Sequence, residues 1–288
     1  MDRVGLSPAN ARRDSGASRA LAKRVAFAVD DLTPARSGAV VLAYHRVGQR
    51  TESEVDLSTE SFRRQIAHLT ADLRVFSLDS FLAANRDEGT SASIENCGDG
   101  IVLTFDDGTA DFVDVVLPIL VEYAVPATIY VATAFIDTGR SFPQDGRPAS
   151  WAGLREAVST GLVSVGAHTH DHILLDRCTR ADAADQFDRS NARIEDELGV
   201  TPIHFAYPKA VLARPEVEAL IESRYESAAL ARTRPNPIGS TNPHRLFRSP
   251  IQVRDGWEGF RRKIAGGMSF EDDVRGLINR YRYRGKTT

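Results

Sequence analysis

The 288-residue sequence has only two cysteines, Cys97 and Cys178, and neither belongs to a CxxC pair. A structural zinc site made of thiolates is therefore excluded. A chain of this length can bury a sizeable core, so it needs no disulfide staples. We interpret both cysteines as free thiols, as is typical of a reducing compartment. Residues 1–24 also lack the apolar segment of a secretory signal. Together these absences predict a cytoplasmic protein.

Long hydrophobic runs are missing as well. The most apolar stretch, residues 113–136, is interrupted by Asp114, Pro118, Glu122 and Pro126, and it predicts a helix, a turn and a strand rather than a membrane span. Positive charge is not in excess either. The net charge is −3, with basic ends and an acidic middle. This distribution argues against nucleic acid as the main partner.

Composition divides the chain into three parts. Residues 1–37 are polar, are punctuated by proline and glycine, and predict a weakly ordered leader. Residues 38–255 are long enough for one large domain, and residues 256–288 predict a helical extension. The basic segment of residues 280–284 (RYRYR) could make a weak peripheral contact with an anionic membrane. A solvated helix end is the simpler interpretation of that segment.

Short apolar segments alternate with amphipathic helical segments along the middle of the chain. Strands that alternate with helices predict parallel βαβ units. About seven strands favour an α/β barrel over an open sheet, and barrel chemistry gathers at the carboxyl ends of the strands. The expected strands are residues 39–44, 73–77, 101–105, 127–131, 162–167, 203–206 and 227–230. The expected helices are residues 59–72, 78–85, 109–124, 151–160, 180–198, 214–223 and parts of 255–283.

Two adjacent carboxylates, Asp106 and Asp107, end the expected strand of residues 101–105 in the motif TFDDG. Adjacent carboxylates repel each other unless something neutralises one of them. A bound cation could neutralise Asp107 and leave Asp106 free to act as a base. Taken alone, the motif is equally compatible with a simple Asp-Gly turn at the end of a strand.

Three of the seven histidines, His168, His170 and His172, lie within five residues, directly after the expected strand of residues 162–167. Imidazole is a common ligand for zinc and related ions. Two histidines and one carboxylate would leave coordination positions open for water and substrate, as in a catalytic metal site. Spacing alone does not decide which two histidines bind. A solvated histidine-rich loop is the alternative, which the acidic pair at the end of another strand disfavours.

Two further segments follow expected strands. His45 comes directly after residues 39–44, where it would face the same barrel mouth, although a lone histidine is usually a core residue. Tyr207 and Pro208 follow residues 203–206. A Tyr-Pro pair in that position could form a rigid wall of a substrate site or a plain turn.

The order of these motifs resembles the polysaccharide deacetylase (NodB-homology) family, carbohydrate esterase family four. The likeness covers roughly residues 38–255 and rests on TFDDG, on His-Thr-x-x-His and, more weakly, on Phe-Ala-Tyr-Pro. It implies an α/β fold with a distorted, partly open (β/α)7-type barrel. The activity that it implies is removal of N-acetyl groups from a glycan. Tyr44 and His45 are similar to the opening of the poly-N-acetylglucosamine deacetylase branch.

The resemblance also implies a role for each motif residue. Asp106 matches the catalytic base, and His45 would be the general acid that protonates the leaving amine. A divalent metal is implied, with zinc expected and cobalt or nickel as alternatives. Its implied ligands are Asp107, His168 and His172. The residues implied to bind substrate or support the site are Thr169, Tyr207, Pro208, Lys209 and Arg248.

The chain departs from the family pattern in the third motif and after it. Ala206 stands where many members have an arginine that braces the catalytic aspartate, and Arg248 resembles a later arginine that could replace it. Lys209 stands where the branch usually has tyrosine. No histidine follows His244, so the last motif of many members is missing. The general acid therefore depends on His45.

These departures keep two other functions open. One is hydrolysis of a different non-peptide C–N bond, such as a small amide or a formamide, on the same scaffold. The other is a non-catalytic glycan- or metal-binding relative. The second carboxylate, Asp106, argues against the non-catalytic alternative, because binding alone does not need it.

Overall fold

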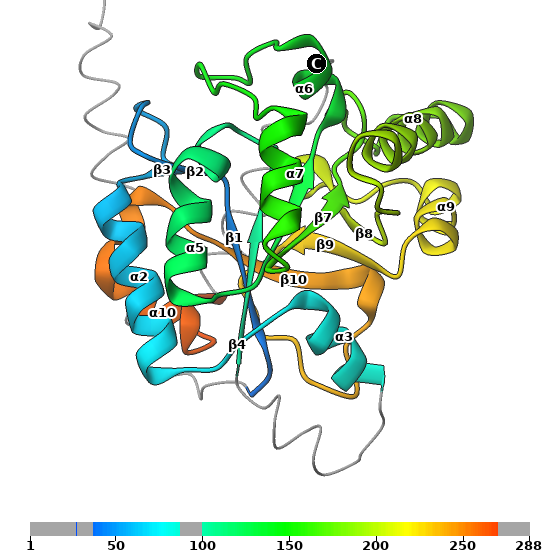
Figure 1. Ribbon diagram of the computed structural model, residues 1–288. Coiled ribbons are helices and arrows are strands. Elements are labelled where there is room, and N and C mark those ends of the chain that lie inside the picture. The colour runs from blue at the N-terminus through cyan, green and yellow to red at the C-terminus, as the bar shows by residue number, and fades with distance from the viewer. Residues whose placement is uncertain (1–26, 28–36, 87–99, 270–288) are drawn as a thin grey trace, which may run out of the picture.

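A closed ring of seven parallel strands lies at the centre of the computed structural model, which describes residue 27, residues 37–86 and residues 100–269 (Figure 1). The strands are β1 (Val40–Tyr44), β5 (Ile101–Phe105), β6 (Ala127–Val131), β7 (Val163–Ala167), β8 (His204–Ala206), β9 (Ser227–Ala231) and β10 (Leu246–Pro250). Their order around the ring is β1, β10, β9, β8, β7, β6, β5, and β5 pairs with β1 to close it. The shortest strand pairing in the ring is between β7 and β8, with one register pair, Ala167 and Phe205. The expected seven-stranded α/β barrel is confirmed, but its strand ring is closed by the β1–β5 pairing rather than partly open.

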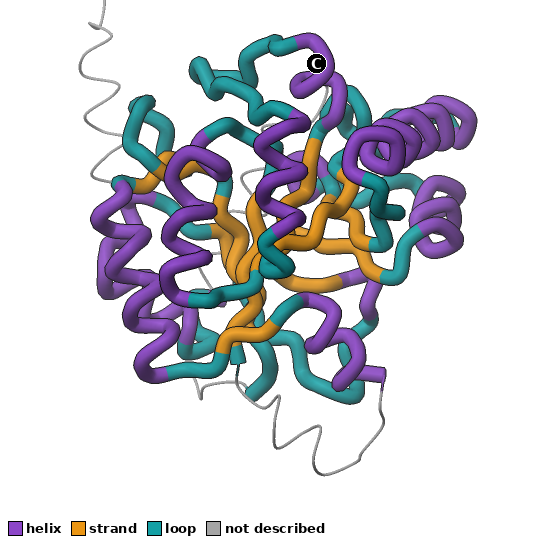
Figure 2. The backbone as a smooth tube through the Cα atoms, in the orientation of Figure 1, coloured by secondary structure: helices purple, strands orange, loops and turns teal. Residues whose placement is uncertain are grey.

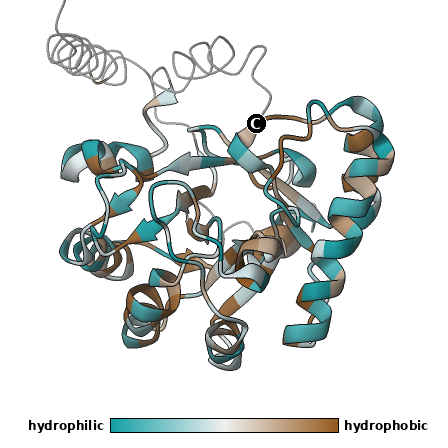
Figure 3. Cartoon of the chain, turned by 90° about the horizontal axis from the view of Figure 1, so that it is seen from above, coloured by the Kyte–Doolittle hydropathy of each residue, from teal (hydrophilic) through white to brown (hydrophobic). Residues whose placement is uncertain are grey.

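Helices surround the ring, as the tube drawing and the view from above show (Figures 2 and 3). They are α2 (Thr59–Asp72), α3 (Leu78–Arg86), α5 (Leu117–Tyr123), α6 (Thr133–Thr138), α7 (Trp151–Ser159), α8 (Arg180–Leu198), α9 (Pro215–Arg224) and α10 (Gly256–Ile264). In α8 the buried positions recur every three or four residues, from Ala183 to Ile194. One face of this helix therefore packs on the barrel while the other meets solvent.

Local capping sets the ends of the two helices whose limits agree with the sequence prediction. The Ser58 side chain accepts a hydrogen bond from the Ser61 backbone N–H at the start of α2. Thr179 and Asp182 form a capping box at the start of α8, and Gly199 ends that helix at φ +67°.

The interior of the barrel is filled by a cluster separate from the one beneath the outer helices. Its strand residues include Val41, Val102, Tyr130 and Leu246, and α3 adds Phe81. Successive side chains of a strand point to opposite faces. The residues two and four places after Val102 therefore also face inward, and these are Thr104 and Asp106.

Gly166 is required by this packing. It is the register partner of Tyr130 on β6. A Cβ atom at position 166 would lie 2.6 Å from the Tyr130 ring and 2.7 Å from the His204 carbonyl oxygen. Any side chain here would therefore displace the Tyr130 ring or the β8 backbone.

Several elements differ from the sequence prediction, and α6 was not expected at all. The helix expected over residues 109–124 begins as a π-helical segment, Phe112–Val116, and α5 follows with Pro118 in its first turn. Proline has no N–H to donate within a helix, and the wider turn accommodates it. One of the seven expected ring strands, residues 73–77, contributes only the short β4 (Val75–Phe76), which pairs with the start of β5 outside the ring. β10 takes its place in the ring.

Several predictions fall outside the described residues, namely the leader, Cys97 and the basic segment of residues 280–284. The expected C-terminal extension begins as α10, whose Lys263 ammonium donates to the Asp255 carboxylate and to the Pro250 carbonyl. Across residues 37–86 and 100–269, no helix combines the length and the apolar character that a membrane crossing needs.

Candidate functional site

Three ligand-type side chains converge at the carboxyl ends of β5 and β7. The Asp107 Oδ1 atom lies 3.4 Å from His172 Nε2 and 3.7 Å from His168 Nε2. One donor atom from each residue can be chosen so that all lie within 4.8 Å of one another. Two donors that each lie about 2.0–2.1 Å from one tetrahedral ion are about 3.3–3.4 Å apart. The arrangement therefore fits a shared divalent cation.

The hydrogen bond of His168 fixes which ring nitrogen can bind a cation. Its Nδ1 lies 2.7 Å from the backbone carbonyl oxygen of Ala206 on the neighbouring strand β8. A carbonyl oxygen only accepts, so Nδ1 carries the proton and Nε2 keeps its lone pair toward Asp107. A backbone carbonyl in this position is a common way to orient a metal-binding imidazole.

The charge states of the three residues also suit a cation. Burial is the main cause that lowers the pKa of His172, to about 3, and burial likewise lowers the pKa of His168. Burial alone would raise the pKa of Asp107, but nearby groups, His172 first, hold it below its ordinary value. At neutral pH the set is two neutral imidazoles and one carboxylate, the forms that bind divalent metals.

Asp106 points into the barrel, where it meets Arg248 on β10. The two guanidinium NH groups donate to the two carboxylate oxygens at 2.6 and 2.8 Å, and both side chains are buried. The same guanidinium donates to the Thr104 hydroxyl at 3.2 Å and to the Leu230 carbonyl at 3.3 Å. Burial alone would raise the pKa of Asp106, but its neighbours, Arg248 first, hold it far below the ordinary value. Asp106 is therefore an ionised, rigidly held acceptor beside the metal ligands.

His45 follows the carboxyl end of β1 and lies near Asp106. Its Nε2 is 3.8 Å from Asp106 Oδ2, and its side chain is 27% exposed. The buried Nδ1 has no hydrogen-bond partner within the described part of the chain. The ring therefore has access both to the carboxylate and to solvent, which a satisfied core histidine would not have.

The remaining motif residues support the site or border it. Tyr207 is buried and donates its hydroxyl to Glu218 on α9. Pro208 is also buried, whereas Lys209 is exposed. The charge of Lys209 is among the smaller causes that lower the pKa of Asp107 and of His172. The buried Thr169 hydroxyl accepts from the Ile173 N–H at 3.3 Å.

The third histidine of the cluster turns away from the other two. His170 Nδ1 lies 2.7 Å from the Thr133 hydroxyl, on α6. The next residue, Asp171, exchanges hydrogen bonds with the Gln186 side chain on α8. The motif spacing left the choice among the three histidines open until the resemblance was considered. The sequence also did not predict α6, because six residues are too few to show helical periodicity.

The sequence of residues 94–225 matches the polysaccharide deacetylase family. This segment contains Asp106, Asp107 and all three clustered histidines, whereas His45 and Arg248 lie outside it.

Several solved structures share the fold. IcaB from Ammonifex degensii is 23% identical with a TM-score of 0.68, over 80% of this chain and 98% of that chain. The deacetylase PplD from Streptococcus pyogenes, solved with acetate, is 18% identical with a TM-score of 0.68, over 79% and 98%. A de-N-acetylase from Aggregatibacter actinomycetemcomitans is 19% identical with a TM-score of 0.64, over 79% and 100%.

Proposed function

We propose that this chain is an enzyme of the polysaccharide deacetylase family, which uses a divalent cation to remove N-acetyl groups from an N-acetylhexosamine-containing glycan. The observation that carries the proposal is the pairing of two unlike carboxylates. Asp107 faces two neutral imidazoles, while the adjacent Asp106 is held ionised by Arg248. A binding protein needs the first arrangement only, whereas a hydrolase needs both.

The residues divide the reaction among them. When bound by Asp107, His168 and His172, a divalent cation supplies Lewis-acid polarisation and acidifies water. Asp106 accepts the proton of the water that attacks the acetamide carbonyl, and Arg248 fixes the plane of its carboxylate. His45 donates a proton to the departing amine nitrogen as the C–N bond breaks. The products are acetate and a glucosamine-type residue.

The finer assignments extend this proposal. We infer zinc as the cation, with cobalt or nickel as alternatives, because two imidazoles and one carboxylate suit all three. We also infer that residues 38–255 are the catalytic domain. The position of His45 directly after β1 supports a substrate of the poly-N-acetylglucosamine class. The free Cys178 thiol supports a cytoplasmic location.

We also propose a weak contact of residues 280–284 with anionic membranes. It predicts that less protein pellets with anionic vesicles when residues 275–288 are removed. Unchanged pelleting would contradict this contact.

An acetate-release screen tests the substrate class. Protein stripped with a chelator is reloaded with zinc, cobalt or nickel and given N-acetylated glucosamine oligomers. We expect acetate release only in the reloaded samples. Absence of release from every oligomer and every metal would contradict the proposal.

The second candidate is a hydrolase of another non-peptide C–N bond. Lys209, exposed beside the ligand set, favours it because an ammonium there could bind a small anionic amide. The same screen, run with small amides and formamides, separates the two candidates. Faster turnover of the small amides than of the glycan oligomers would favour the second.

The general-acid role of His45 gives a kinetic prediction. We expect His45→Gln to lower kcat by roughly 10²–10⁴-fold, because the amine would leave without a positioned proton donor. Zinc content should be unchanged, since His45 is not among the three ligands. His68→Gln is the matched control: His68 is similarly exposed and lies 2.7 Å from Asp72, but on α2 outside the site. Unaltered kinetics in His45→Gln would return His45 to an ordinary structural histidine.

A further inference from the structure

The loop that carries both histidine ligands has a backbone that its sequence does not favour. This segment, residues 168–172, is called the metal loop below. Thr169 and His172 adopt φ of +60° and +57°. Left-handed backbone is unfavourable at residues other than glycine and persists only where the neighbouring structure holds it. The conformation of the metal loop must therefore be imposed from outside.

The segment that imposes it runs from the end of β6 into α6. The Val131 carbonyl accepts from the His168 N–H at 3.1 Å, and the Ala132 N–H donates to the Asp107 carbonyl at 3.0 Å. One short stretch of backbone thus contacts both halves of the ligand set. It fixes the Asp107 side and the histidine side relative to each other.

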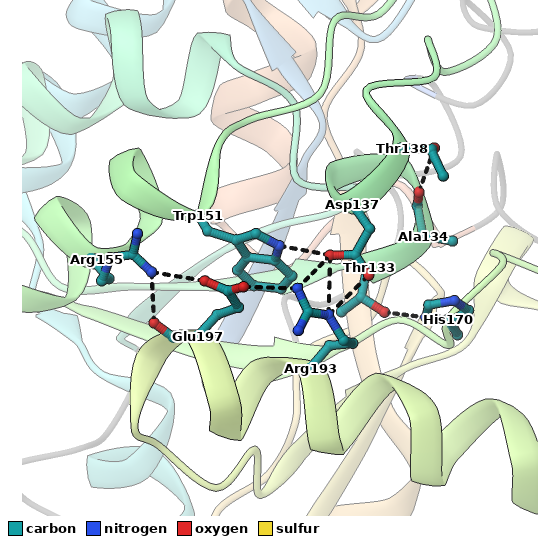
Figure 4. A network of polar contacts seen from close by, with 9 residues as sticks. All are labelled: Thr133, Ala134, Asp137, Thr138, Trp151, Arg155, His170, Arg193 and Glu197. Atoms are coloured by element: carbon teal, nitrogen blue, oxygen red, sulfur yellow. Dashed lines mark hydrogen bonds and ion pairs between the residues drawn. The ribbon is translucent and has the colours of Figure 1, made fainter.

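The start of α6 adds two contacts to the middle of the metal loop. The Ala134 N–H donates to the His170 carbonyl at 2.9 Å, and the Thr133 hydroxyl lies 2.7 Å from His170 Nδ1 (Figure 4). Thr133 is fully buried and His170 is 7% exposed, so water does not compete for these bonds. His170 is therefore held between the two residues that would bind the cation.

The other end of α6 is fastened to two further helices. The Asp137 carboxylate accepts from Arg193 on α8 at 2.9–3.1 Å and from the Trp151 indole N–H on α7 at 2.8 Å (Figure 4). Arg193 also donates to Glu197, to which Arg155 donates as well. α6 is thus a fixed body against which the metal loop is set.

We propose that Thr133 and His170 are positioning residues of the metal site, which clamp the metal loop to α6 and so set the spacing of the ligands. The inference rests on the proposed function, since it assumes that Asp107, His168 and His172 hold a cation. It assigns a purpose to the third histidine of the cluster, which the ligand set does not use.

The test is zinc affinity of the full chain, measured by competition with a chromophoric chelator. Thr133→Val keeps the side-chain shape and removes the hydroxyl. We expect it to weaken zinc binding roughly 10-fold, the lower end of the 10–100-fold loss that follows removal of a direct contact to a metal ligand, because His170 is not itself a ligand. Thr133→Ser should restore the affinity. Thr138→Val is the matched control, because it removes a 2.6 Å threonine bond to the Ala134 carbonyl on the same helix without touching the metal loop.

Two further measurements separate positioning from general stability. His170→Ala removes the same bond from the other side, so the double variant should lose no more affinity than the worse single variant. Cobalt-loaded Thr133→Val should show an altered visible spectrum, which reports ligand geometry. Wild-type zinc affinity in both Thr133→Val and His170→Ala would overturn the positioning proposal and leave the proposed metal site unaffected. A wild-type chain that binds no divalent cation would overturn both the clamp and the metal-dependent function.

Discussion

Asp106→Asn should nearly abolish acetate release while the cation stays bound, whereas Asp107→Ala should release the cation. We expect Asp106→Asn to lower kcat by roughly 10²–10⁴-fold, because the amide cannot take the proton of the attacking water. The amide oxygen can still accept from Arg248, which donates to the carboxylate at 2.6 and 2.8 Å, so the local fold should survive. Asp107→Ala removes the only carboxylate of the three-residue ligand set.

The two variants are compared by metal analysis after gel filtration and by acetate release. Asp114→Asn is the control, since Asp114 follows the same motif but is exposed and pairs with Arg50 and Arg147. Full activity in Asp106→Asn would show that another group is the base. Wild-type zinc content in Asp107→Ala would show that the ligand set is wrong. The pattern of one variant losing turnover and the other losing metal separates the two carboxylates.

Elements with local signals were predictable from the sequence. The limits of α2 and α8 agree with prediction because a capping side chain starts each helix and apolar residues recur at helical spacing. β5 and β6 were predicted at their observed limits because each is a short run of apolar and β-branched residues. In these elements the residues that form the structure are neighbours in the chain.

Elements stabilised by distant partners were not predictable. β10 was not among the expected strands, because Arg248, Ser249 and Pro250 give it no apolar pattern, yet it is a buried strand of the ring. A buried arginine is favourable there only because Asp106, on a different strand, neutralises it. α6 has six residues, too few to show helical periodicity. Its role depends on His170, which is 37 residues away from Thr133.

The site was predictable in its chemistry but not in its geometry. The TFDDG and histidine motifs, with the family resemblance, named the residues that the structure brings together at the carboxyl ends of β5 and β7. Sequence spacing could not show that His168 is held by the Ala206 carbonyl or that His170 turns toward α6. Those orientations come from hydrogen bonds to neighbouring elements, which no single motif encodes.

Arg248→Met should destabilise the fold more than any surface substitution. It removes the counter-charge of Asp106, and breaking one partner of a buried ion pair typically costs about 3–5 kcal/mol. Arg248 is 1% exposed and Asp106 is 5% exposed, so solvent cannot replace the lost partner. The control is Arg86→Met, whose side chain is 61% exposed in its pair with Glu226. Exposed pairs contribute about 0–1 kcal/mol.

The stability that Arg248→Met loses relative to the wild type should depend on pH in a defined direction. In the wild type, the Asp106 pKa is lowered by its neighbours. The ion pair therefore stabilises the fold fully above the ordinary pKa of an aspartate, and this stabilisation is lost as pH falls through the lowered pKa. In Arg248→Met, burial raises the Asp106 pKa instead, so the variant loses stability as pH rises through that raised value. The difference between the two proteins should therefore be largest near neutral pH and shrink toward pH ~4.

Urea unfolding of metal-free protein at several pH values measures this difference. The double variant Asp106→Asn with Arg248→Met should recover part of the stability, because it buries no unpaired charge. Equal stability of Arg248→Met and wild type at neutral pH would show that Asp106 does not need this counter-charge to stay ionised. The alternative cause of destabilisation is lost packing of the guanidinium against the Tyr130 ring, which lies 5.2 Å away. Changing Asp106 does not restore that packing, so recovery in the double variant indicates an electrostatic cause.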